Sequence, residues 1–292
     1  MNWKTRYLLR LQSFLGWLSI FAIAPLTHLF VRVMRYRVRE LRRTRRTIRH
    51  LFKEHKGPWI ICPNHLTMID SVVLQCAMAP LHGYMVWYRR FPWNLPERAN
   101  FQKNIFLTVI CYLSKCIPIS RGGDRGKIKA TLDRCVYLLK RRESLLIFPE
   151  GGRSRTGRVD VEKASYGVGR LVANAPQCRV MCMYLRGDGQ ETYGGIPRFG
   201  ERFTMQIEAF KPEMEGRGLK AQRSCARQIV ERLARMEKEY FDRKRHRGSY
   251  GPSGTGEKSG YSLHGHGVHA GLAVLDSRQQ QSGHDALDPV DG

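Results

Sequence analysis

The chain has 292 residues, 42% of them hydrophobic, and its formal net charge is +25 at pH 7. This length and apolar content exclude general disorder and leave room for a sizeable core. The charge predicts an anionic partner, which composition leaves open between nucleic acid, an anionic membrane surface and a phosphorylated substrate.

The first predicted element is an apolar segment over residues 13–31, close to the minimum length that crosses a bilayer. Pro25, Thr27 and His28 weaken it, and basic residues flank it on both sides. A cleaved signal peptide is the competing interpretation, but the segment lacks a small-x-small cleavage site and the arginines after it oppose translocation. We therefore predict a retained membrane anchor, either spanning once or monotopic, with the downstream chain on the cytoplasmic side.

A single helix is predicted over residues 31–52, where apolar residues recur at helical spacing beside a row of arginines. The apolar face consists of Val31, Met34, Val38, Leu41, Ile48 and Phe52. This helix either lies at the headgroup level, with each arginine on a lipid phosphate contributing roughly 1 kcal/mol, or packs on the folded domain. Nucleic-acid binding is a third option; the neighbouring anchor and the absence of a recognisable nucleic-acid module in the sequence argue against it.

Residues 53–247 are predicted to form the folded domain, after an anchor and basic helix over residues 1–52. Apolar runs predict strands at residues 59–62, 84–88, 116–119, 144–148, 180–185 and 203–209. Amphipathic patterns predict helices over residues 69–78, 104–113, 128–139 and 219–245. Strands alternating with helices predict an α/β fold with a mixed, mostly parallel sheet covered by helices.

The final segment, residues 248–292, is rich in glycine, serine and histidine and is predicted to be disordered. The eight cysteines lie mostly inside apolar runs, and none forms a Cys-x-x-Cys pair. We therefore expect buried free thiols in a reducing compartment, with neither a disulfide framework nor a metal clip.

Chemistry is first indicated by His65 and Asp70, which follow the predicted strand at residues 59–62. Imidazole takes up a proton near neutral pH, and a carboxylate can fix its tautomer. Five residues apart on one helix, the two side chains would point about 140° apart. They meet only if His65 lies in the turn after the strand and Asp70 in the first helical turn. The alternative is a capping aspartate and an unrelated histidine.

A second candidate segment is FPEGGRS at residues 148–154, which follows the strand predicted at residues 144–148. Its two glycines let backbone amides approach an anion closely. Another predicted strand ends at residues 120–123, SRGG, in the same way. Arginines beside glycine turns suit bidentate capture of phosphate, which makes Arg121 and Arg153 candidate phosphate ligands. The alternative for each is a solvated loop arginine.

These residues resemble the glycerolipid acyltransferase family, which includes 1-acylglycerol-3-phosphate and glycerol-3-phosphate acyltransferases. Its first motif, Asn-His-x-x-x-x-Asp, is matched by Asn64, His65 and Asp70. Its third, Phe-Pro-Glu-Gly-Thr-Arg-Ser, is matched at every position but one by residues 148–154. The resemblance covers roughly residues 57–210.

The second and fourth motifs of that family are matched loosely. Ser120 stands beside Arg121 where an aspartate is usual, and Lys115 stands where glycine is common. Residues 180–183 correspond to the fourth motif without its proline. Gly152 replaces the threonine of the third motif. The departures beside the two arginines bear on which acceptor headgroup is bound and do not touch the histidine.

The resemblance implies acyl transfer from a thioester to a hydroxyl. His65 would be the general base that deprotonates the hydroxyl, and Asp70 would orient and charge-stabilise it. The implied acceptor site contains Arg121 and Arg153 as phosphate ligands and is shaped by Glu150 and Gly151. No metal and no tightly bound cofactor is implied, since positioning and base catalysis suffice for a thioester.

The sequence thus predicts a membrane-bound O-acyltransferase with a lyso-lipid acceptor, 1-acylglycerol-3-phosphate first, and an acyl-CoA or acyl carrier protein donor. The same chemistry on glycerol-3-phosphate, a lysophospholipid or a lyso-aminolipid is the nearest alternative. A non-catalytic basic membrane-binding protein is the alternative from another class. The predicted partners are the anionic membrane surface, the acceptor lipid and the donor, without nucleic acid.

Overall fold

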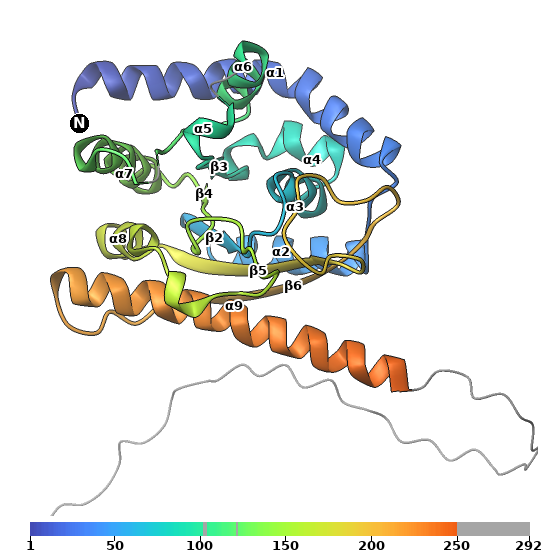
Figure 1. The fold of residues 1–292 in the computed structure, drawn as a ribbon. Helices are drawn as coiled ribbons and strands as arrows, with labels where there is room; N and C mark the ends of the chain where they lie inside the picture. The colour runs from blue at the N-terminus through green and yellow to red at the C-terminus, as the bar shows by residue number, and fades with distance from the viewer. Residues whose placement is uncertain (102–103, 121, 250–292) are drawn as a thin grey trace, which may run out of the picture. The chain divides into compact units, whose positions relative to one another are not determined.

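The computed structural model describes residues 1–101, 104–120 and 122–249 of the chain (Figure 1). Its strands are β1 (Arg37–Val38), β2 (Trp59–Pro63), β3 (Trp93–Asn94), β4 (Leu145–Leu146), β5 (Arg179–Gly187) and β6 (Arg202–Phe210). Its α-helices are α1 (Trp3–Val33), α2 (Leu41–Glu54), α3 (Asp70–Met78), α4 (Leu81–Val86), α5 (Arg98–Phe101), α6 (Ile105–Leu113), α7 (Arg125–Lys140), α8 (Tyr166–Asn174) and α9 (Gly218–Ser249). The 3-10 helices η1 (Tyr88–Arg90) and η2 (Val161–Lys163) complete the described elements.

The strands of the described residues form one sheet in the order β1-β6-β5-β2-β4-β3. β5 and β6 pair antiparallel, and the other neighbouring strands pair parallel. Beyond β3, isolated parallel bridges join Asn94 to Cys116 and Glu97 to Ile119, so this segment continues the edge of the sheet. The predicted α/β class and the mixed, mostly parallel sheet are confirmed.

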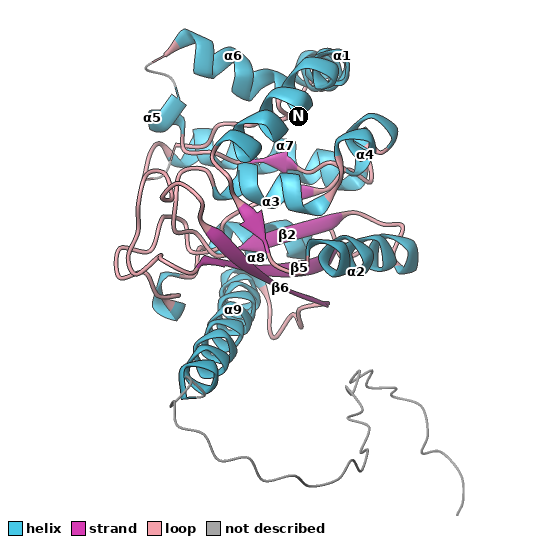
Figure 2. Cartoon of the chain, turned by 90° about the vertical axis from the view of Figure 1, so that its right-hand side faces the viewer, coloured by secondary structure: helices cyan, strands magenta, loops and turns pink. Residues whose placement is uncertain are grey.

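Helices cover both faces of this sheet (Figure 2). Side chains along each strand point alternately to the two faces, so apolar residues on both faces need a covering layer. Ile60 and Cys62 of β2 join a core with α7, α8 and α9. Their neighbours Trp59 and Ile61 join a second core with α2 and α3 on the opposite face. Both faces of β2 are therefore buried, which explains its continuous apolar sequence.

The single helix predicted over residues 31–52 is wrong, because the chain reverses between α1 and α2. Arg35 and Glu40 adopt left-handed conformations, with φ of 52° and 49°, and the residues between them pair with β6 as β1. Backbone pairing at the sheet edge replaces the helical hydrogen bonds there. In α2, Thr44 and Ile48 are buried, so packing of this helix on the domain is confirmed. Lipid contact by its exposed arginines stays a prediction.

The strand predicted over residues 84–88 is also wrong. These residues lie in α4 and η1, and Tyr84 and Tyr88 share a buried cluster with Ile20 and Ala24 of α1. Both rings face α1 from two short consecutive helices, and a spacing of four also fits the period of a strand over so short a run. Of the strand predicted at residues 144–148, only β4 is regular. The predicted elements at β2, β5, β6, α3, α6, α7 and α9 are confirmed, whereas β1, β3, α5 and α8 were not predicted.

Helix α1 packs along the domain from near its start to its end. Leu9 belongs to the core beneath α7 and α8, and the Gln12 amide donates to the carbonyl oxygens of Tyr112 and Cys116, at 2.9 Å each. Phe30 and Val31 pack against the second core. Its outward face remains apolar and exposed. By length and composition, α1 is the one helix among the described residues that suits a membrane span, although signal sequences and core helices meet the same criterion.

All eight cysteines are free thiols and seven of them are buried, as predicted. Burial raises the pKa of Cys135 and of Cys178 to about 12, which keeps these thiols protonated and inert. The domain boundaries predicted at residues 52 and 247 stay predictions. Of the tail predicted from residue 248, residues 250–292 lie outside the described part of the chain.

Candidate active site

The two specific motifs meet at the carboxyl ends of β2 and β4, neighbouring parallel strands at the centre of the sheet. Ile60 and Ile61 pair with Leu145 and Leu146, and the Ile147 amide donates to the Ile61 carbonyl at 3.0 Å. This register brings the turn after β2 beside the loop after β4. Carboxyl ends of parallel strands are where ligands bind in open α/β sheets.

His65 and Asp70 are in contact, as the turn-and-helix arrangement requires. His65 lies in the turn after β2, Asp70 is the first residue of α3, and Nδ1 of the histidine is 3.1 Å from Oδ2 of the aspartate. The same Oδ2 accepts from the amides of Leu66 and Thr67, at 2.7 and 2.8 Å. The Thr67 hydroxyl donates to Oδ1. Asp70 therefore both caps the turn and holds the imidazole.

Asn64 has a structural part in this arrangement that motif recognition alone does not reveal. Its side-chain amide donates to the Leu185 carbonyl at 3.0 Å, and its Oδ1 accepts from the Leu185 amide at 2.7 Å. The side chain thus replaces one backbone pairing with β5, so the main chain can leave the sheet and turn towards His65. Because Asn64 is buried, an apolar replacement would leave both groups of Leu185 unpaired.

The imidazole of His65 is held on one face by an aromatic ring and at Nδ1 by Asp70. Its ring stacks on Phe148 with centroids 3.8 Å apart, and its side chain is 12% exposed. No described residue hydrogen-bonds to Nε2, and this atom is not among the fully buried polar atoms that lack a partner. Nδ1 faces a carboxylate while Nε2 remains open to an incoming group.

Glu150 lies directly beneath this turn. Its Oε1 accepts from the His65 amide at 3.2 Å, and the next residue, Gly151, has a φ of 68° that favours glycine. Burial raises the pKa of Glu150 to about 7, against the lowering effect of hydrogen bonds from the backbone at His65 and Asp160. The carboxyl group is therefore partly protonated near neutral pH and stays a hydrogen-bond acceptor for the turn that carries His65 in either form.

Glu150→Gln should change how stability depends on pH. The folded state holds the Glu150 proton up to about pH 7, whereas the unfolded chain releases it near 4.5. The contribution of this group is complete below pH 4.5 and is lost as pH rises to about 7. Relative to the glutamine variant, the wild type should lose about 3 kcal/mol of unfolding free energy over that interval. Denaturant titrations at pH 5 and 7.5 measure this, with the exposed Glu162→Gln as control; parallel pH profiles for wild type and Glu150→Gln would contradict it.

Arg153 is held against a loop that runs from Gly187 to Gly200. Its Nη1 donates to the Gly194 carbonyl at 3.0 Å, and its guanidinium lies 5.6 Å from the Tyr193 ring centroid. The remaining guanidinium hydrogens have no partner among the described residues. Arg153 is thus fixed in place, half-buried and still able to bind an anion.

This loop was not predicted to take part in the site. The Gly194 amide donates to the Leu66 carbonyl, and the Met68 amide donates to the Gly195 carbonyl, at 3.0 Å each. The loop therefore forms a wall beside the turn that carries His65. Its glycine content was the available signal, although glycines mark turns without indicating what they contact.

Arg121, the other predicted phosphate ligand, lies outside the described residues. Its described neighbour Ser120 follows Ile119, which bridges to Glu97 just after β3. Among the described residues, no group of three histidine, cysteine, aspartate or glutamate side chains is placed to hold a metal ion.

A mixed α/β sheet with a histidine–aspartate pair, an open Nε2 and a held arginine at one edge is typical of enzymes that activate a hydroxyl for group transfer. The family model described as Acyltransferase matches residues 34–186, from just before β1 to the end of β5. The chain belongs to the acyltransferase family, as its motifs indicate. A comparison with curated proteins finds no match.

Proposed function

We propose that this acyltransferase moves a fatty acyl group from a thioester donor to the free hydroxyl of a lyso-glycerolipid. The first-choice acceptor is 1-acylglycerol-3-phosphate, which gives phosphatidic acid. The observation that carries the proposal is the contact between His65 Nδ1 and Asp70 Oδ2, which leaves Nε2 open. The donor is acyl-CoA or acyl carrier protein.

The proposed reaction uses His65 as a general base. Since Asp70 carboxylate oxygens only accept, they select the tautomer with the proton on Nδ1 and the lone pair on Nε2. Nε2 takes the proton of the acceptor hydroxyl while its oxygen attacks the thioester carbonyl carbon. The tetrahedral intermediate then expels the thiolate, which recovers the proton from Nε2. One ester forms, one thioester breaks and the histidine is regenerated.

The acceptor headgroup is assigned to the loop side of the pair. Arg153, and Arg121 from the second motif, would bind its phosphate, while Glu150 and Gly151 shape the floor. Support comes from the way Arg153 is fixed against the 187–200 loop beside the turn that carries His65. Pre-ordering an arginine lowers the entropy that a phosphate contact costs.

We also propose that the protein binds a membrane with its active site on the cytoplasmic side. The outer face of α1 is apolar, and α6, which packs on α1, exposes Ile105, Phe106 and Val109. Because α1 is held to the domain along its length, a helix lying in one leaflet fits better than a span. The arginines of α2 would add affinity for anionic lipid.

The function is tested by an acyl-transfer assay of membranes containing the protein, with oleoyl-CoA and a panel of acceptors: 1-acylglycerol-3-phosphate, glycerol-3-phosphate, a lysophospholipid and a lyso-aminolipid. We expect the first to react fastest. In that assay Arg153→Ala should raise the acceptor KM about tenfold and leave the donor KM unchanged. Arg155→Ala, which removes an exposed arginine two residues away, is the matched control.

Two results would contradict the proposal. Transfer to no acceptor in the panel would favour a binding protein without activity. Equal loss of donor and acceptor affinity in Arg153→Ala would contradict the assignment of Arg153 as a ligand of the acceptor phosphate. This holds even if the wild-type protein transfers acyl groups. Expression in a strain that lacks its own 1-acylglycerol-3-phosphate acyltransferase, followed by lipid profiling, identifies the product independently.

A further inference from the structure

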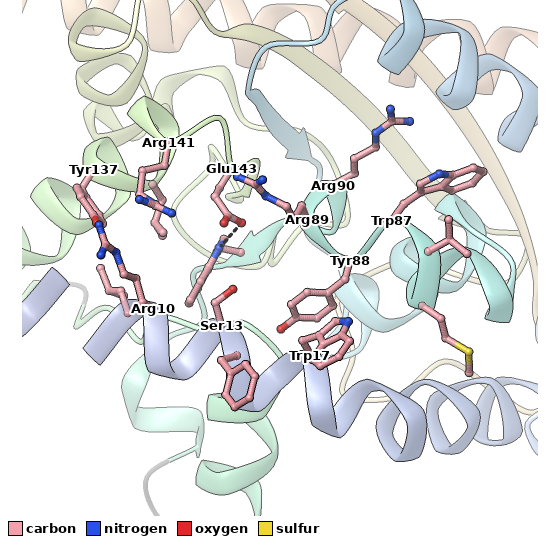
Figure 3. Close-up of a pocket in the computed structure, with 16 residues that line it drawn as sticks. Arg10, Ser13, Trp17, Trp87, Tyr88, Arg89, Arg90, Tyr137, Arg141 and Glu143 are labelled. Carbon is pink, nitrogen blue, oxygen red and sulfur yellow. Dashed lines mark hydrogen bonds between the residues drawn. The ribbon is translucent and has the colours of Figure 1, made fainter. Parts of the chain in front are cut away.

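A cavity of about 590 Å³ lies between the first half of α1, η1 and the turn from α7 to β4 (Figure 3). Its lining includes Trp93, where β3 begins, and Glu143, just before β4. It therefore lies at the amino ends of parallel strands whose carboxyl ends face His65. This volume suits a small ligand headgroup, and the place is separate from the candidate active site.

The cavity carries an excess of positive charge. Three arginines direct positive charge to it: Arg10 from α1, Arg89 from η1 and Arg141 after α7. The guanidinium of a fourth lining residue, Arg90, points away from the cavity and lies over Phe52 and Trp87. None of them forms an ion pair with a described residue. Glu143, the one carboxylate among the described lining residues, is already bound to Lys115 Nζ and to the Trp93 indole, at 3.1 Å each. The arginines thus lack a counter-charge, which is the arrangement that a phosphate satisfies.

The rim of the cavity is apolar and aromatic, which distinguishes a lipid from a soluble anion. Phe14 and Trp17 of α1 are exposed at one side, and Val86 and Trp87 at the other. Tryptophan and tyrosine favour the depth at which headgroups meet acyl chains. The arginines would bind the phosphate at that depth, and acyl chains would follow the exposed face of α1.

We propose that this cavity binds the headgroup phosphate of an anionic phospholipid that is not the acyl acceptor. Arg10 and Arg141 bind from one end and Arg89 binds from the other. The bound lipid joins α1 to η1 and to the end of α7. It anchors the protein at a defined orientation, independently of acyl transfer.

The test is isothermal titration of the purified full-length protein in a neutral detergent. The ligands are dihexanoyl phosphatidylglycerol, dihexanoyl phosphatidylcholine and inorganic phosphate. We expect phosphatidylglycerol to bind about tenfold more tightly than phosphatidylcholine, and far more tightly than phosphate. Equal binding of phosphate would assign the cavity to a soluble phosphorylated solute and overturn the lipid assignment. Equal binding of the two lipids would overturn the requirement for an anionic headgroup.

Matched variants separate the cavity from the general charge of the protein. Arg10→Gln/Arg141→Gln should weaken phosphatidylglycerol binding about tenfold or more, whereas Arg217→Gln/Arg223→Gln removes two exposed arginines elsewhere and should have little effect. Equal loss in both double variants would overturn the site.

Discussion

Replacing His65 with alanine is expected to lower kcat for acyl transfer about a thousandfold. The Asp70 oxygens are turned toward the imidazole and the backbone amides, and the buried Glu150 carboxyl accepts from the His65 amide, so neither replaces the imidazole as the acceptor of the hydroxyl proton. KM for either substrate should change little. The measurement is a steady-state assay with the preferred acceptor, and His82→Ala, at an exposed histidine, is the control. A His65→Ala enzyme with more than about a tenth of wild-type kcat would remove the base from this position.

Asp70→Asn is the companion change, because it tests the charge beside the imidazole rather than the base itself. An asparagine oxygen in the place of Oδ2 can still accept from the Leu66 and Thr67 amides and from Nδ1, so the turn and the tautomer should persist. Its amide nitrogen then faces the Thr67 hydroxyl, and the negative charge that stabilises the protonated imidazole is lost. We expect a smaller fall in kcat than in His65→Ala, with an almost unchanged Tm. Equal falls in activity and in Tm would indicate a purely structural aspartate.

Lys115→Met is expected to destabilise the fold by about 3–5 kcal/mol. Lys115 is 1% exposed, and its Nζ donates to the carbonyls of Tyr88 and Phe91 at 2.9 and 3.1 Å and to Glu143 at 3.1 Å. Burial lowers the pKa of this amine, while the Glu143 carboxylate opposes that effect. Methionine fills the space but leaves a buried carboxylate and two carbonyls without their donor.

Denaturant unfolding measures this loss of stability. The double variant Lys115→Met/Glu143→Gln should recover part of it, because it also removes the buried carboxylate charge that has lost its partner.

The backbone offers a second comparison, since Lys115 has a φ of 54°. Lys115→Gly should therefore be about 1 kcal/mol less destabilising than Lys115→Ala, because glycine adopts this conformation without a steric cost. A fall of less than about 1 kcal/mol in the free energy of unfolding of Lys115→Met would show that the buried pair contributes little to stability.

The Lys115 result also shows where sequence reasoning ends. The sequence showed that Lys115 stands where glycine is common in the family, and the left-handed backbone explains why glycine is common there. The side chain's partners are Glu143 and the carbonyls of Tyr88 and Phe91, which lie more than twenty residues away along the chain in either direction. Such contacts follow from sheet order, which local patterns do not encode.

The meeting of His65 with Asp70 was predictable because both belong to one strand–turn–helix unit, where spacing fixes geometry. Arg153 was identified as a candidate anion ligand, but the loop that holds it was not, since the contact with Gly194 depends on the return of the chain after β5. The reversal at Arg35 and Glu40 was hidden for another reason. The helical spacing of apolar residues continues through this reversal. Arginine and glutamate are also not residue types that favour a left-handed conformation.

The packing of α1 has a practical consequence for anyone handling this protein. Removing an N-terminal apolar helix is a common way to obtain a soluble enzyme, but here Leu9 lies in one core, and Ile20 and Ala24 cover Tyr84 and Tyr88. A chain starting after Val33 would open these contacts and expose the carbonyls that Gln12 binds. One helix therefore supplies both the exposed apolar surface and part of the folded core. Removing it to gain solubility would also lower the stability of the fold.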